Sequence, residues 1–161
     1  MRKVLIIGLG NPGERYQNNR HNAGHKFVEW LVASGQWLEK DVKVIKTDTF
    51  MNDSGSFVKK FSRTYKLEPS HLFVAHDDLD IPLGQYKIQK GVGPKVHNGI
   101  LSVEKSLNTK DFWRIRIGVD NRDPQNRAPG EDYVLQDFTK EELSILHTVF
   151  DAIIKECPFQ S

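Results

Sequence analysis

Cysteine is almost absent from this chain of 161 residues, since Cys157 is the only one. A lone cysteine excludes an intramolecular disulfide and is expected in the reducing cytoplasm. Long hydrophobic runs are also missing, and no stretch approaches the roughly 18 apolar residues that a membrane-spanning helix needs. Residues 1–10 carry two positive charges and a short apolar run, without the longer apolar segment or the cleavage site of a signal peptide. These absences predict a cytoplasmic protein that does not enter a membrane.

An excess of one charge is missing too, because the formal net charge at pH 7 is only +2. So small a charge does not establish a nucleic-acid partner, although local clusters of lysine and arginine could neutralise a few phosphates. Repeats, low-complexity tracts and Gly/Ser-rich linkers are absent. We therefore expect a single domain over residues 1–161, which is long enough to bury a sizeable core.

Short apolar runs alternate with amphipathic segments along the chain, which predicts an α/β fold with a mainly parallel sheet. Residues 76–80 are interpreted as an acidic turn, and Thr139 with Glu142 as the capping box of the last helix. Side chains with a function should gather at the carboxyl ends of the strands. Strands are expected near residues 3–9, 42–45, 72–75, 86–89 and 113–119 (the last one half-exposed), and helices near 23–33, 54–68, 97–107 and from 140 onward.

Gly8, Gly10 and Gly13 follow the first strand with the G-x-G-x-x-G spacing of a dinucleotide-binding turn. In such a turn the helix begins at once, so that its N-terminus can hold the pyrophosphate. Here Pro12 and a polar stretch delay the helix until about Ala23. The context therefore argues against dinucleotide binding.

His21 lies on a polar turn before a helix, and Asp77 directly follows a buried strand. A histidine oriented by an aspartate is the usual arrangement for general-base activation of water or a hydroxyl. The sequence has no Gly-x-Ser-x-Gly nucleophile motif, so water is the expected nucleophile. The alternative is that His21 only caps the helix or lies on the surface.

The acidic residues at 76–80 could also be interpreted as metal ligands. Neighbouring residues of an extended segment point to opposite faces, however, and no second ligand set such as His-Glu-x-x-His is present. We expect no metal site.

Asn11, Asn52 and Asn98 each stand at a strand-to-helix junction, where one alone would be interpreted as a helix cap. Converging on one edge, three carboxamides would suit a peptide backbone.

Taken together, these segments resemble the bacterial-type peptidyl-tRNA hydrolases. The match runs in the same order over nearly the whole chain, and the set is far more specific than any single motif. The segments are Gly8-Leu-Gly-Asn-Pro-Gly13, Tyr16, Arg20-His-Asn-Ala-Gly24, Thr49-Phe-Met-Asn-Asp-Ser-Gly55, His76-Asp-Asp-Leu-Asp80, His97-Asn-Gly99 and Arg114-Ile-Arg-Ile-Gly118.

The resemblance implies a three-layer sandwich around a mixed, mainly parallel twisted sheet, and a metal-free esterase without cofactors. Its substrate would be peptidyl-tRNA, cleaved between the peptide carboxyl and the 3′-terminal ribose of tRNA. The resemblance makes His21 the general base and Asp77 the group that orients it. Asn11, Asn52 and Asn98 would hold the peptide, with Asn11 helping to reject aminoacyl-tRNA that has a free amine.

Further family positions are carried over in the same way. Tyr16, Phe50 and Met51 would line the cleft for the tRNA 3′ end and the peptide, and Lys87 and Arg116 would contact the phosphate backbone. No obligate protein partner is implied, and we expect a monomer.

The chain also departs from the family pattern. Val92 and residues 94–96 replace glycine or other small residues in the loop before His97, and Gln89 stands where a second basic clamp residue is usual. The segment before Thr49 is shorter than in the family, and the chain ends early, at Ser161. Two alternatives stay open: a non-catalytic RNA-binding relative similar to intron-splicing factors, and a metallohydrolase.

Overall fold

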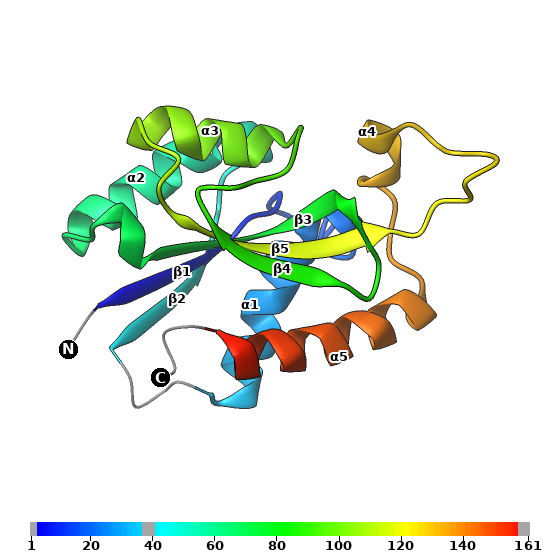
Figure 1. Ribbon diagram of the computed structural model, residues 1–161, viewed down its shortest axis with the longest axis horizontal. Coiled ribbons are helices and arrows are strands. Elements are labelled where there is room, and N and C mark those ends of the chain that lie inside the picture. The colour runs from blue at the N-terminus through cyan, green and yellow to red at the C-terminus, as the bar shows by residue number, and fades with distance from the viewer. Residues whose placement is uncertain (1–2, 37–40, 158–161) are drawn as a thin grey trace.

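A five-stranded sheet forms the centre of the computed structural model, which describes residues 3–36 and 41–157 (Figure 1). The strand order is β2-β1-β3-β5-β4; neighbours are parallel except β4, which is antiparallel to β5. The mixed, mainly parallel sheet confirms the predicted fold class. The strands are β1 (Val4–Gly8), β2 (Val42–Lys46), β3 (Leu72–Pro82), β4 (Tyr86–Lys90) and β5 (Trp113–Asp120).

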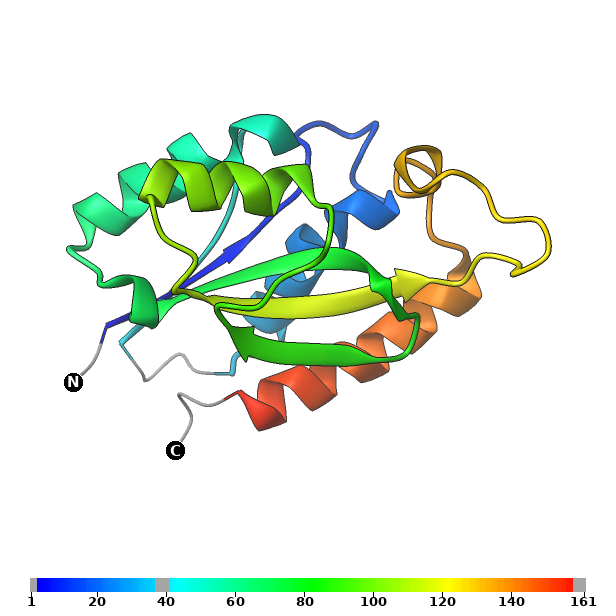
Figure 2. The same ribbon diagram turned by 45° about the horizontal axis from the view of Figure 1, so that its top comes forward.

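Helices cover both faces of this sheet and make it the middle of three layers (Figures 1 and 2). α1 (Ala23–Ser34) and α5 (Lys140–Glu156) pack on one face, around a buried cluster that includes Phe27, Ile115 and Phe150. α2 (Ser54–Thr64) and α3 (Asn98–Leu107) cover the other face with a second cluster. The short elements are α4 (Gly130–Tyr133) and the 3₁₀ turns η1 (Arg20–Asn22), η2 (Met51–Asp53) and η3 (Pro69–His71).

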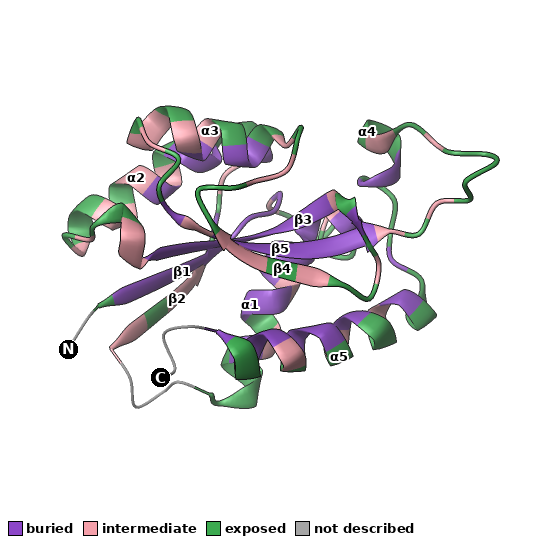
Figure 3. Ribbon diagram, viewed as in Figure 1, coloured by how far each residue is buried: buried purple, intermediate pink, exposed green. Residues whose placement is uncertain are grey.

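The inner strands β1, β3 and β5 are mostly buried, the edge strands β2 and β4 are only partly buried, and the helices show exposed outer faces (Figure 3). The capping box that was predicted for α5 is present, since Thr139 Oγ1 accepts from the Glu142 N–H and Glu142 Oε1 accepts from the Thr139 N–H. Short-range patterns therefore place this helix start correctly. Among the described residues, no helix is both long and apolar enough to cross a bilayer.

Two expectations about the strands were wrong. The acidic segment 76–80 is not a turn, because β3 continues through it and pairs with β5, with His76 opposite Arg116 and Asp77 opposite Ile117. β5 is not half-exposed either, since it lies between β3 and β4 and buries its arginines. Each guanidinium meets a carboxylate, Arg114 with Glu104 and Arg116 with Asp78, and this pairing makes burial of a charge tolerable. The alternation of polar and apolar residues in β5 therefore reflects two buried environments, one apolar and one in which arginines pair with carboxylates.

Glycines bring α1 close to the carboxyl ends of β1 and β3. A Cβ atom on Gly8 would collide with the carbonyl oxygen of Gly24, and a Cβ on Gly24 would collide with that of Ala75. α1 itself begins at Ala23, well after the glycine-rich turn. The glycines therefore serve helix–strand packing at this edge, where no helix N-terminus follows the turn to hold a pyrophosphate.

Candidate active site

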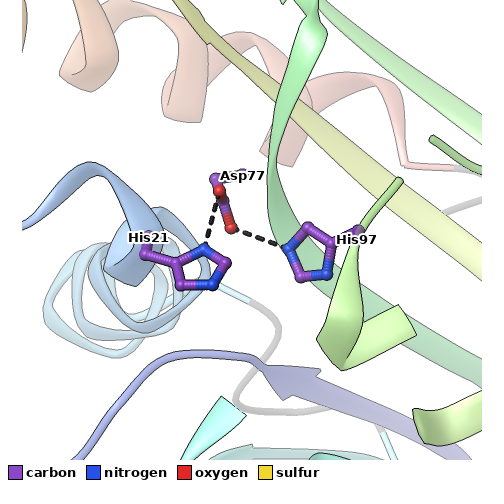
Figure 4. Close-up of side chains that lie close together, drawn as sticks. All are labelled: His21, Asp77 and His97. Atoms are coloured by element: carbon purple, nitrogen blue, oxygen red, sulfur yellow. Dashed lines mark hydrogen bonds and ion pairs between the residues drawn. The ribbon is translucent and has the colours of Figure 1, made fainter. Parts of the chain in front are cut away.

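Three side chains from separate parts of the chain meet at Asp77, in the middle of β3 (Figure 4). The Nδ1 atom of His21 lies 2.9 Å from Oδ2 of Asp77, and Nε2 of His97 lies 2.9 Å from Oδ1 of the same carboxylate. Asp77 is buried, whereas the side chain of His21 is 16% exposed. The carboxylate thus bridges two imidazoles, and one of these imidazoles can reach solvent.

The hydrogen bonds identify the protons that the two imidazoles carry. Nδ1 of His97 accepts from the backbone N–H of Ile100, 3.1 Å away, and so carries no proton. The neutral ring must then be protonated on Nε2, which donates to Asp77. When His21 is neutral and donates its Nδ1–H to Oδ2 of Asp77, its Nε2 keeps a free lone pair. That lone pair can accept a proton.

Electrostatics favour a charged Asp77 beside His21. Burial alone would raise the pKa of Asp77, but its interactions and hydrogen bonds with His21 and His97 hold it far below its usual range. Burial lowers the pKa of His21, yet the charge and hydrogen bond of Asp77 outweigh it, so the net pKa is raised above 6.5. A raised pKa makes His21 a stronger base.

Two other histidines near the site are unsuited to this role. His76 is fully buried and donates its Nδ1–H to the Asp77 carbonyl at 2.7 Å, and burial lowers its pKa to about 3. His25 binds Thr47 Oγ1 at 2.9 Å, and burial lowers its pKa to about 4. Both therefore stay neutral and enclosed at neutral pH, whereas His21 is partly exposed and has a raised pKa.

The same three side chains lie close enough together to be considered as metal ligands. One ligand atom from each of His21, Asp77 and His97 lies within 4.8 Å of the others. A neutral imidazole that binds a metal through Nε2 must carry its proton on Nδ1, but Nδ1 of His97 accepts from the N–H of Ile100. Metal binding would break this helix cap. The donor set therefore fits a hydrogen-bonded triad and not a resident ion.

The turn that carries His21 is held from outside the sheet. The backbone N–H of His21 donates to the Val134 carbonyl at 2.8 Å, and the backbone N–H of Arg20 donates to the Gln136 carbonyl at 3.1 Å. The buried Arg20 guanidinium pairs with Glu142 at 2.8 Å and stacks on the Tyr133 ring at 3.9 Å. The segment between α4 and α5 thus determines where His21 lies.

Asn11 is clamped by a second asparagine. Its backbone N–H donates to Oδ1 of Asn22 at 2.8 Å, and its carbonyl accepts from Nδ2 of Asn22 at 2.9 Å. Its side-chain oxygen accepts from the backbone N–H of Met51 at 2.7 Å. Since the oxygen is occupied, the Nδ2 amide is the part of Asn11 that remains for a ligand.

The asparagines do not act as helix caps. Asn52 belongs to η2, and Asn98 is the first residue of α3, whose N-cap is His97. Asn52 and Asn98 are exposed and line one groove of about 490 Å³ between α2 and α3. Asn98 also lines a cavity of about 660 Å³ that contains His21 and Asp77. Two of the three asparagines therefore share a groove, and Asn98 joins that groove to the cavity of His21.

The other site residues from the sequence divide into two places. Tyr16 and Phe50 lie edge to face with ring centroids 6.1 Å apart, next to the buried Met51. Lys87 and Arg116 face each other across β4 and β5, where Lys87 is exposed and Arg116 is paired with a buried carboxylate. Neither of these two lines the cavity of His21.

Sequence reasoning missed three residues that shape the site, namely Arg20, Asn22 and His97. Each stands beside a residue that was singled out, but nothing in the local pattern links it to its partner 11 to 122 positions away. Only the motif Arg20-His-Asn and the dipeptide His97-Asn98 pointed to these positions.

Comparisons with known proteins place the whole chain in one family. The model of the peptidyl-tRNA hydrolase family matches residues 5–160. The peptidyl-tRNA hydrolase of Marinobacter nauticus is 36% identical over 96% of this chain and 87% of its own length. The peptidyl-tRNA hydrolase of Cupriavidus metallidurans is 38% identical over 93% of this chain and 87% of its own length. The crystal structure of peptidyl-tRNA hydrolase from Acinetobacter baumannii has a TM-score of 0.78 at 30% identity, covering 95% of this chain and 85% of its own. The chain belongs to the peptidyl-tRNA hydrolase family.

Proposed function

We propose that this chain hydrolyses the ester that joins a peptide to the 3′-terminal ribose of tRNA, with His21 as the general base on water. The observation that carries the proposal is the 2.9 Å contact between His21 Nδ1 and the buried Asp77 carboxylate. The family to which the chain belongs is named for this activity. Water is the nucleophile because the described lining of the His21 cavity contains no serine or cysteine.

The reaction follows from the positions of the protons. Nε2 of His21 takes a proton from water, and the resulting hydroxide attacks the ester carbonyl to form a tetrahedral intermediate. Asp77 stabilises the imidazolium, and His97 holds the second oxygen of this carboxylate. The imidazolium then returns the proton to the ribose oxygen as the ester bond breaks. The Nδ2 amide of Asn11 supplies a hydrogen bond to the peptide end or to the oxyanion.

The groove residues then bind the peptide. Carboxamides of Asn52 and Asn98 pair with main-chain amides, which every peptide offers regardless of its sequence. Tyr16 and Phe50, with Met51 beneath them, form an apolar wall at the junction with the tRNA 3′ end. Lys87 and Arg116 are the candidate contacts to the phosphate backbone. The cytoplasmic location and the monomeric state predicted from the sequence complete this proposal.

Hydrolysis of N-acetyl-aminoacyl-tRNA against unblocked aminoacyl-tRNA tests the function and the role of Asn11 together. Wild type should cleave the blocked substrate and largely spare the unblocked one. Asn11→Ala should lower this ratio by about tenfold, the effect of one lost hydrogen bond. The matched control is Asn18→Ala, on the turn that follows Asn11, whose exposed side chain accepts from Lys26 Nζ at 2.9 Å. Unchanged selectivity in Asn11→Ala would contradict the role of Asn11.

The same assay separates the enzyme from its alternatives. A non-catalytic RNA-binding relative would bind tRNA and leave the blocked substrate intact, even as wild type. The metallohydrolase alternative requires that chelation abolish turnover, whereas the proton positions at His97 predict full activity in excess chelator.

The pH dependence of kcat/KM follows from the raised pKa of His21. Only neutral His21 can accept the proton, so kcat/KM should rise with pH and level off above a midpoint higher than 6.5. Asp77→Asn removes the charge that raises this pKa, so the midpoint should move to lower pH while the plateau falls. A pH series of initial rates measures both. A midpoint that stays in place in Asp77→Asn would show that another group titrates.

A further inference from the structure

A buried pair of polar side chains, His25 on α1 and Thr47 just after β2, contacts the turn that carries Asn11. The two residues are 7% and 3% exposed, and Nε2 of His25 lies 2.9 Å from Oγ1 of Thr47. The same hydroxyl lies 3.3 Å from the carbonyl oxygen of Gly10. The imidazole ring packs on Gly10 as well, because a Cβ atom there would come within 2.7 Å of Cγ of His25. Neither side chain takes part in the proton transfers described above.

The hydrogen bonds of this pair run in one direction. The Gly8 carbonyl, 3.4 Å from the Thr47 hydroxyl, already accepts from the backbone N–H of Thr47 at 3.0 Å. The Gly10 carbonyl is buried, and among the described residues this hydroxyl is its donor. A buried carbonyl without a donor is costly, so the hydroxyl proton points to Gly10. The hydroxyl oxygen then accepts from Nε2–H of His25, whose ring stays neutral because burial lowers its pKa to about 4.

This hydrogen bond reaches Asn11 through one rigid unit. The carbonyl of Gly10 and the N–H of Asn11 belong to the same planar peptide group. Thr47 holds the carbonyl side of that group, and Oδ1 of Asn22 holds the N–H side at 2.8 Å. The side-chain oxygen of Asn11 is fixed by the N–H of Met51, four residues after Thr47. Backbone and side chain are thus fixed together, which sets the direction of the Nδ2 amide.

We propose that His25 and Thr47 are positioning residues, which act through the Gly10–Asn11 peptide to aim the Asn11 amide and thereby set the selectivity for blocked over unblocked aminoacyl-tRNA. The inference rests on the proposed function for the identity of the substrate. Its structural part, the coupling of Thr47 to Asn11, is separate. Hydrogen bonds weaken steeply when their geometry is lost, so a small rotation of this peptide group is sufficient to lower selectivity.

The selectivity ratio measures this coupling; it is kcat/KM for N-acetyl-aminoacyl-tRNA divided by kcat/KM for unblocked aminoacyl-tRNA. Thr47→Val keeps the side-chain shape and removes the hydroxyl, so it should lower the ratio by about three- to tenfold, the effect of one hydrogen bond. Thr47→Ser restores the hydroxyl and should stay within about twofold of wild type. In an Asn11→Ala background, Thr47→Val should change the ratio by less than about twofold, because the amide that it positions is gone.

The matched control is Thr148→Val, on α5. Thr148 is exposed, and its hydroxyl also donates to a backbone carbonyl, that of Ser144 at 3.4 Å. This variant removes the same chemical group far from Asn11 and should leave the selectivity ratio at the wild-type value. If Thr47→Val fails to fold, His25→Ala interrupts the same hydrogen bonds from their other end and should lower the ratio in the wild-type background only.

Hydrogen exchange of the Asn11 backbone amide provides a measurement that needs no turnover. Loosening of the Gly10–Asn11 peptide should open its hydrogen bond to Asn22, so exchange should accelerate in Thr47→Val and return to the wild-type rate in Thr47→Ser. The amide of Ile6, buried in β1, reports any global loss of stability. Faster exchange at Asn11 relative to Ile6 therefore identifies a local effect.

Two results would overturn the proposal. One is a folded Thr47→Val or His25→Ala variant that keeps the wild-type selectivity ratio and the wild-type exchange rate at Asn11. The other is an equal fall of the ratio in the wild-type and Asn11→Ala backgrounds, because Thr47 would then act independently of Asn11. A wild type that leaves N-acetyl-aminoacyl-tRNA intact, while Asn11 exchange still responds to Thr47→Val, would contradict only the proposed hydrolysis and would support the coupling.

Discussion

Replacing His21 with alanine is expected to lower kcat for N-acetyl-aminoacyl-tRNA by about 10²- to 10⁴-fold, the usual contribution of a general base. His21 is the histidine at this site whose pKa is raised and whose side chain reaches the cavity. His76 and His25 cannot replace it, because burial holds their pKa values near 3 and 4. Single-turnover kinetics at saturating enzyme would measure the chemical step free of product release.

The control for this prediction is His147→Ala. His147 stacks on Trp30 between α5 and α1, 4.2 Å between ring centroids, and does not line the cavity of His21. Its removal should change kcat by less than about twofold, as for a surface substitution. If His21→Ala retained the activity of His147→Ala, general-base catalysis by His21 would be wrong. Binding of deacylated tRNA should persist in His21→Ala, which shows that the loss lies in chemistry.

Arg20→Met is expected to destabilise the protein by about 3–5 kcal/mol, because it leaves the Glu142 carboxylate buried without its partner. The side chains of Arg20 and Glu142 are 7% and 3% exposed and meet at 2.8 Å. For a chain of this size the loss corresponds to a Tm lower by about 6–20 °C. Thermal unfolding followed by circular dichroism measures it. Because Arg20 adjoins His21, kcat should fall as well, at temperatures where the variant is fully folded.

A matched exposed pair provides the control. Arg127 also contacts a carboxylate at 2.8 Å, that of Asp120, but its side chain is 59% exposed. Arg127→Met should therefore cost no more than about 1 kcal/mol. Adding Glu142→Gln to Arg20→Met should recover part of the loss, since glutamine removes the unpaired charge and can still complete the capping box with Thr139. Equal Tm values for Arg20→Met and Arg127→Met would refute the buried-pair argument.

Sequence patterns succeeded where the determinant is local. The start of α1 at Ala23, the capping box of Thr139 and Glu142, and the alternation of strands and helices depend on residues within a few positions of one another. Patterns failed in the second half of β3, where residues 76–80, three of which are aspartates, were taken for a turn. Strand pairing with β5 and the pairing of Asp78 with Arg116 make an extended, buried segment stable there. Both contacts are remote in sequence.

The candidate site shows the same division. The sequence pointed to His21 and Asp77 as a pair and to water as the nucleophile, and the structure places these two side chains 2.9 Å apart. It did not indicate that His97 shares the carboxylate, because that contact depends on where the loop before α3 lies. Nor did it indicate that Arg116 is neutralised, since a buried and an exposed arginine look alike in a strand pattern.

By itself, the sequence determined the α/β class and the family, because these follow from local periodicity and from motifs kept in order; it also predicted that His21 and Asp77 form a pair. The tertiary structure decided which side chains are charged, buried or free. It placed His97 on Asp77, Asn22 on Asn11 and Asp78 on Arg116. The physical reason is that pKa values, tautomers and ion pairs depend on distances of a few ångströms and on exclusion of water. The separation of two residues along the sequence reveals neither the distance between them nor whether water is excluded from them.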